Sequence, residues 1–233
     1  MLVYILFIFG PWIGVIGTNR ICDTPISIEC VIPRDIPTLR IPQTVEDVNR
    51  LCPATSQYLN CLKDYADECG YENVHQHFSE DTYQSIKDLV RDVCQNDSRL
   101  HLDIVENIAC ISESQDQFEN DCLENLLDKL EILKQFIHNK QQDGTYDEPR
   151  FSEKLWLRMN CVTQSLTVSC FSSQVSRRCG TAARDAVVEV VARSKGLKLV
   201  CPPVIGERIN ELLRILDLGM EEKRLLDEIM KKK

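Results

Sequence analysis

Two absences in this 233-residue sequence bear on its compartment. Residues 1–17 contain no acidic or basic side chain, and no later stretch approaches the roughly 20 consecutive apolar residues of a membrane-spanning helix. The first segment is apolar but interrupted by a glycine and a proline, and small residues stand three and one positions before Thr18. We therefore expect residues 1–17 to be a cleaved signal peptide, with a signal anchor as the alternative, and no membrane span in the mature chain.

Closely spaced cysteines are also missing, because the nearest two of the 12 cysteines are eight positions apart. Structural zinc sites usually contain Cys-x2-Cys pairs, so this spacing argues against zinc. An even number of cysteines behind a signal peptide instead predicts a disulfide framework without a free thiol. The expected bridge residues are Cys22, Cys30, Cys52, Cys61, Cys69, Cys94, Cys110, Cys122, Cys161, Cys170, Cys179 and Cys201.

Local catalytic and cofactor motifs are absent as well. The sequence has no G-x-S-x-G, no H-E-x-x-H and no glycine-rich phosphate loop. The one close histidine pair, His75 and His77, lacks a third ligand at a defined spacing, so two solvated loop histidines are the expected interpretation. We therefore expect no catalytic, cofactor-binding or metal-binding residue and a protein that is not an enzyme.

The net charge of −9 conceals an asymmetry along the chain. Residues 18–149 carry 11 Lys and Arg against 26 Asp and Glu, and residues 150–233 carry 16 against 10. The two parts either attract each other or present a basic surface to an anionic partner. Nucleic acid is not an expected partner of a secreted chain whose basic residues have no interleaved aromatics. That surface would comprise Arg177, Arg178, Arg184, Arg193, Lys195 and Lys198.

The single N-x-S/T sequon is Asn96-Asp97-Ser98, at a predicted turn between two helices. In a secreted chain such a turn predicts glycosylation of Asn96, with an unmodified asparagine as the alternative.

Apolar residues recur at helical spacing through most of the chain, and no convincing segment of period two is present. The sequence therefore predicts an all-α fold, a disulfide-stapled helical bundle. Pro53 is expected to kink or restart the first long helix. The predicted helix starts are Thr44, Ser79 and Asp97 or Ser98, and the predicted helix ends are Gly70 and Gly180.

We expect a signal peptide at 1–17, a proline-rich extended arm at 18–43 carrying Cys22 and Cys30, a first helical cysteine unit at 44–98, a second at 99–218 and a charged C-terminal helix at 219–233. Within the second unit, helices are expected at 115–140, from 153 to 179, from Thr181 and at 205–216, with a loop at 139–150.

An internal repeat of cysteine spacing gives these two units. The run Cys52-x8-Cys61-x7-Cys69-Gly, followed after 23 residues by a cysteine, matches Cys161-x8-Cys170-x8-Cys179-Gly, followed after 20 residues by another. Two further cysteines precede each run. The sequence therefore predicts two related units of six cysteines each.

Helix geometry constrains how these cysteines pair. Nine helical residues rise about 13.5 Å, whereas bridged Cα atoms lie within about 7 Å, so the three cysteines of one run cannot pair with one another. Each therefore needs a partner outside its run, and we expect pairing within each unit. The composition of the loop at 139–150 suggests another partition, in which the eight cysteines before the loop pair among themselves and the four after it do the same. Helix geometry argues against that partition. The specific pairs expected are Cys52–Cys94 and Cys161–Cys201, and the partners of the other eight stay open within their units.

The run from Cys52 to Cys201, with Cys179-Gly180 before an Ala/Val-rich helix, resembles uncharacterised secreted helical cysteine-rich proteins of arthropods, particularly arachnids. It is similar in pattern to insect haemolymph glycoproteins and nematode secreted domains of unknown function. The resemblance implies a secreted helical fold and no particular activity.

We expect a secreted, non-enzymatic protein of body fluid, venom or saliva that binds an unidentified extracellular protein. The alternative is a carrier of small lipophilic ligands. The x8 spacings resemble those of insect odorant-binding proteins, whose C-x3-C pair this sequence lacks.

Overall fold

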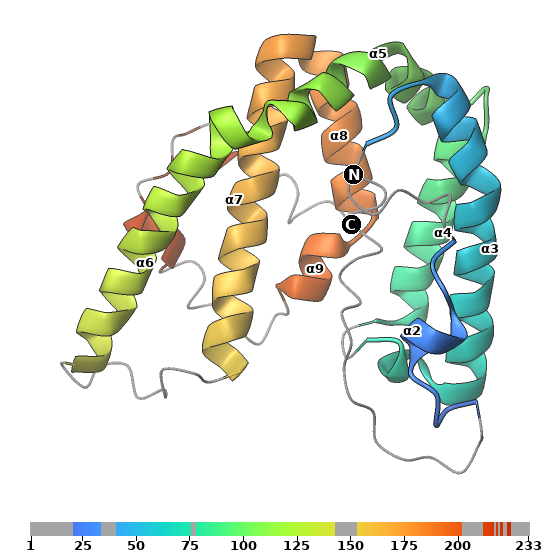
Figure 1. Cartoon of the computed structure of the whole chain (residues 1–233), viewed down its shortest axis with the longest axis horizontal. Coiled ribbons are helices and arrows are strands. Elements are labelled where there is room, and N and C mark those ends of the chain that lie inside the picture. Colours follow the sequence, from blue (N-terminus) through green and yellow to red (C-terminus); the bar gives the residue numbers. More distant parts are fainter. Residues whose placement is uncertain are drawn as a thin grey trace.

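Figure 1 shows the computed structural model of the chain. Every regular element that it describes is helical, so the predicted all-α class is confirmed. The expected signal peptide and most of the expected C-terminal helix lie outside the described residues. The structure describes residues 21–33, 41–75, 78–142, 153–201 and 212–216, together with residues 218, 220, 223 and 224.

The first part is a helical hairpin of α3 (Val45–Cys69) and α4 (Glu80–Cys94), which pack against each other. The short 3-10 turn η1 (Tyr71–Asn73) follows α3. One helical turn, α2 (Ile26–Glu29), packs against α3, so the arm expected to be extended is partly helical. Pro25 precedes α2, where its fixed φ angle is compatible with a helix start.

The predicted helix starts are confirmed by their hydrogen bonds. Thr44 Oγ1 accepts from the Asp47 backbone N–H at 3.1 Å, and Asp47 Oδ2 accepts from the Thr44 backbone N–H at 3.2 Å, which is a capping box. Ser79 and Ser98 start α4 and α5 (Arg99–Asp116), each accepting from the backbone N–H three residues on, at 3.2 and 3.0 Å. These bonds satisfy backbone donors that have no partner within the helix.

The predicted ends are confirmed too, since Gly70 and Gly180 follow α3 and α7 (Glu153–Cys179) with φ angles of 92° and 88°. Glycine adopts this left-handed region without the steric cost of a Cβ atom.

Of the two outcomes expected at Pro53, a kink or a restart of the helix, the restart does not occur, because α3 is one helix with that proline inside it. Leu51 and Thr55, on either side of the proline, are both buried. The bridges at Cys52 and Cys61 hold the two sides in place, so tertiary constraints offset the lost backbone hydrogen bond.

In Figure 1, the chain runs from α5 at the top of the view into α6 at the left. The π-helical turn η2 links α5 to α6, and α7 lies between α6 and α8. Residues 212–215 are also helical, whereas the earlier part of the helix expected at 205–216 lies outside the described residues. The bounds are α5 (Arg99–Asp116), η2 (Glu119–Leu123), α6 (Glu124–Gln142), α7 (Glu153–Cys179), α8 (Thr181–Arg193) and α9 (Gly196–Val200).

Two boundaries in this part differ from the prediction. Gln115 lies in the last turn of α5 and does not start a new helix. The first residues of the loop expected at 139–150 are helical instead, because α6 extends to Gln142. The Lys and Gln residues at 140–142 are good helix formers, and no glycine or proline lies between residue 139 and Gly144. Residues 143–150 of the expected loop lie outside the described part of the chain.

Two clusters of buried apolar side chains form the core. The first joins α3, α4 and α5 with Phe171 and Val175 of α7 and with one face of α8. The second joins α6, α7, α9 and the other face of α8 with Leu212, Leu216 and Leu218. The core therefore crosses the expected boundary at residue 98, since α5 and α8 pack directly against the α3–α4 hairpin. No helix in the described ranges is both long and apolar enough to cross a membrane.

Candidate functional site

All twelve cysteines lie in the described ranges and form six disulfide bridges, with none left free. The bridged Cα atoms are 4.9 to 5.9 Å apart, within the range that a bridge requires. The structure contains both specific pairs expected from helix geometry. The bridges are Cys22–Cys69, Cys30–Cys61, Cys52–Cys94, Cys110–Cys179, Cys122–Cys170 and Cys161–Cys201.

The six bridges fall into two groups of three. The N-terminal group joins the six cysteines up to Cys94, and the C-terminal group joins the six from Cys110 onward. Numbered in chain order, each set pairs its first cysteine with its fifth, its second with its fourth and its third with its sixth. No bridge joins the two groups, so the backbone between Cys94 and Cys110 is their only covalent connection.

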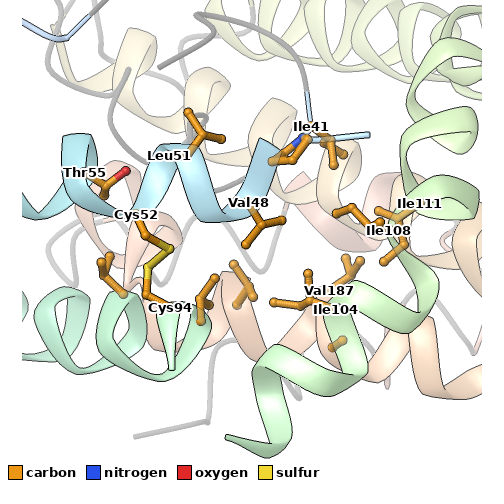
Figure 2. Close-up of a pocket in the computed structure, with 15 residues that line it drawn as sticks. Ile41, Val48, Leu51, Cys52, Thr55, Cys94, Ile104, Ile108, Ile111 and Val187 are labelled. Atoms are coloured by element: carbon orange, nitrogen blue, oxygen red, sulfur yellow. A yellow bond between two sulfur atoms is a disulfide. The ribbon is translucent and has the colours of Figure 1, made fainter. Parts of the chain in front are cut away.

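A cavity of about 70 Å³ lies where the two groups meet, and we call it the seam cavity. The N-terminal group contributes side chains from α3, α4 and the segment at Ile41, while the C-terminal group contributes α5 and α8. Figure 2 shows Val48, Ile108 and Val187 around one space, beside the Cys52–Cys94 bridge. The lining residues are Ile41, Pro42, Val48, Leu51, Cys52, Thr55, Val90, Val93, Cys94, Ile104, Ile108, Ile111, Ala186, Val187 and Val190.

The lining of the seam cavity is almost wholly aliphatic. Thr55 carries the one polar side chain among its residues, and none of them is charged or aromatic. Thr55 is itself buried, with 6% of its surface exposed. An apolar space of this kind offers water few hydrogen-bond partners and can take up small apolar molecules. The arrangement can therefore bind apolar molecules, and its wall carries one hydroxyl and no charged side chain.

Polar contacts also join α4 to the C-terminal end of α8. The Arg193 guanidinium lies 2.6 Å from Asp92 Oδ2, and the Ser85 hydroxyl donates to the Arg193 carbonyl oxygen at 2.7 Å. Burial raises the pKa of the Asp92 carboxyl, but hydrogen bonds from Arg193 and a second arginine outweigh it, so this pKa lies below its ordinary value. Lys195, just after α8, pairs with the Asp81 carboxylate. We call these contacts the α4–α8 clamp.

The clamp bears on the two interpretations of the charge asymmetry. Arg193 and Lys195, two residues of the candidate basic surface, pair with carboxylates of α4. Arg184 Nη1 lies 2.6 Å from Asp185 Oδ1, whereas Arg177 and Lys198 are exposed. Opposite charges of the two parts of the chain therefore meet within the molecule, and a basic surface for an anionic partner stays a prediction.

The predicted glycosylation site lies on the backbone that connects the two bridge groups. Asn96 is exposed in the turn between α4 and α5. The Ser98 hydroxyl of the same sequon caps α5 and also bonds the Asp92 carbonyl oxygen, so it is engaged in the folded protein. Modification of Asn96 stays a prediction.

The structure describes three of the four histidines. His75 lies after η1, while His77 is outside the described residues. His101 is buried, and its Nδ1 lies 2.7 Å from the Val93 carbonyl oxygen, a bond within the α4–α5 corner. No cluster of three or more metal-ligating side chains occurs in the described part of the chain.

The seam cavity is the feature that sequence reasoning missed. Most of its aliphatic residues belong to the apolar stripes that predicted the helices. Helical spacing reveals which residues of one helix share a face, but not which helices bring their faces together.

No protein-family model, curated protein or solved structure matches the chain. The resemblance to secreted cysteine-rich proteins of arthropods therefore stays a prediction.

Proposed function

We propose that this protein is a secreted, non-enzymatic protein that acts by binding, built from two related six-cysteine helical units. The observation that carries the binding function is the seam cavity, an aliphatic space between the two bridge groups with no charged side chain on its wall. Such a wall favours apolar molecules through burial and dispersion contacts.

The pairing order supports the two related units. The same first–fifth, second–fourth, third–sixth order occurs in both groups of three bridges. In both groups, the helix that carries three cysteines ends at a glycine with positive φ, Gly70 or Gly180. A shared core across α5 and α8 means that the two units would fold against each other and not as independent domains.

The bridges also support secretion. Disulfides persist in oxidising compartments and are rare in the cytosol, so six bridges without a free thiol fit an extracellular protein. The apolar segment at 1–17 provides the expected export signal.

Two kinds of binding partner are candidates. Exposed apolar side chains on α6 and α7, namely Leu127, Ile132 and Trp156, are where a protein partner would be sought. A carrier of small lipophilic ligands is the second candidate, and the seam cavity favours it. Pockets for drug-sized ligands usually occupy about 300–1,000 Å³. A cavity of about 70 Å³ therefore suits only a small ligand unless it enlarges.

The test is a native mass spectrum of the protein secreted by a eukaryotic host, recorded before and after reduction. We expect a chain that begins at Thr18 with six bridges and a glycan on Asn96. A small apolar molecule in the native spectrum supports the carrier, and a bare chain that captures a protein from body fluid supports a protein-binding role. A retained residue 1 together with reactive thiols before reduction would contradict the secreted, bridged protein.

A further inference from the structure

We propose that the seam cavity is the closed form of a binding site for a small aliphatic molecule with at most one polar group, and that it enlarges when α4 separates from α8. This inference rests on the proposed binding function and names the ligand class and the route of entry.

The wall of the cavity sets the ligand class. A carboxylate or ammonium group would lose its hydration there without gaining a charged partner, which is costly. Because none of the lining residues is aromatic, the cavity offers no ring for stacking. The Thr55 hydroxyl is able to form a hydrogen bond with one alcohol or carbonyl group. These features together select an aliphatic alcohol, aldehyde, ketone or hydrocarbon.

The size of the cavity implies opening for longer members of this class. An engineered apolar cavity of about 150 Å³ accommodates benzene or xenon. The seam cavity has about half that volume, so its closed form admits only an atom such as xenon or a few heavy atoms. An aliphatic chain of about eight carbons requires its walls to move apart.

The bridges determine where the walls move apart most easily. Each group is held together internally by three bridges, but none crosses the seam. Movement of α4 away from α8 breaks the apolar contacts between them and the α4–α8 clamp, whose central pair is Asp92 and Arg193. The bond from the Ile41 N–H to Gln115 Oε1, at 2.6 Å, also crosses the seam. Between α4 and α5 the chain is not helical at residues 95–98, which provides a pivot.

The first experiment tests the closed cavity with xenon, a probe that fits without opening. In the bridged, full-length secreted protein, we expect saturable chemical-shift changes confined to methyl groups of the lining, such as those of Val187 and Ile108. Ala186→Val adds two methyl groups to the lining and should weaken xenon binding about tenfold. Ala192→Val, the same change at a buried position of α8 outside the lining, should leave it unchanged.

Val190→Ile replaces Ala186→Val if that variant does not fold. Absence of saturable xenon shifts in the unmodified protein overturns the site. Equal loss of xenon binding in the lining variant and in Ala192→Val also overturns it, because the effect would then come from general repacking.

The second experiment tests opening with 1-octanol, a chain too long for the closed cavity. We expect octanol to shift the same methyl groups, and its association rate to rise roughly threefold in Asp92→Asn, which weakens a half-exposed ion pair of the clamp. Asp88→Asn is the matched control, because Asp88 pairs with Arg91 within α4 and makes no clamp contact. Thr55→Val should weaken octanol binding roughly fivefold without changing xenon binding.

The outcomes separate this inference from the proposed function. Octanol binding with equal association rates in Asp92→Asn and Asp88→Asn overturns opening at the clamp. If neither xenon nor octanol binds but the native spectrum shows another bound molecule, the cavity site is overturned and the binding function stands. Xenon uptake confined to the lining, together with a bare native spectrum, supports the site and counts against the carrier role.

Discussion

Filling the seam cavity should stabilise the protein, and Ala186→Val is the most informative substitution for this purpose. Ala186 is 3% exposed and lines the cavity from α8. Residual cavities destabilise proteins by about 24 cal/mol per Å³, so eliminating about 70 Å³ recovers up to about 1.7 kcal/mol. The same figure follows from burying two methyl groups at about 0.8 kcal/mol each.

One cost reduces this gain. Valine is less favourable than alanine in a helix by about 0.5 kcal/mol, because its branched side chain loses rotamer freedom. We therefore expect a net increase in the free energy of unfolding of about 1 kcal/mol. Ala192→Val has the same helix-propensity cost, but its side chain has no cavity to fill. Overpacking should therefore destabilise this variant by about 1–3 kcal/mol.

Both variants are compared by denaturant unfolding followed by circular dichroism, with the bridges intact and the unmodified protein alongside. The expected order of stability is Ala186→Val, then the unmodified protein, then Ala192→Val. If Ala186→Val is destabilised as much as Ala192→Val, the space beside Ala186 is already filled and the reasoning is refuted.

Three further predictions concern the bridges, the sequon and the clamp. Trypsin cleavage at Lys140 and Arg150 should leave the two fragments joined on a gel until reductant is added, because two bridges cross that segment. Asn96→Gln should remove one glycan from the secreted protein with little effect on stability, whereas Ser98→Ala should remove the glycan and also cost about 1 kcal/mol through loss of the cap of α5. Because the pKa of the Asp92 carboxyl is lowered by folding, its stabilising effect is present above the ordinary pKa of 3.8 and is lost as the pH falls through the lower folded value. Acid unfolding of Asp92→Asn should therefore be less steep below about pH 4 than that of the unmodified protein.

The sequence predicted features that depend on local chemistry. The caps at Thr44, Ser79 and Ser98 follow from side-chain oxygens placed before apolar periods. The stops at Gly70 and Gly180 follow from the φ angles that only glycine adopts without cost. The rise of a helix likewise excluded bridges among cysteines of one run.

Features that depend on tertiary contacts were not accessible in the same way. Spacing alone could not decide whether Cys22 pairs with Cys61 or with Cys69, since both candidate partners lie in the same helix, α3. Whether α3 continues through Pro53, and α6 to Gln142, depends on the side chains that pack around each helix. The seam cavity arises where four helices and the segment at Ile41 meet, a placement that no single stripe encodes.

The central claim is that two closed groups of bridges meet at a seam that no bridge crosses. It is tested by replacing residues 95–97 with the recognition sequence of a specific protease, cleaving there and running a denaturing gel without reductant. The account predicts two fragments that separate, because only the backbone connects Cys94 to Cys110. Fragments that stay together until reductant is added would show a bridge across the seam and contradict the account.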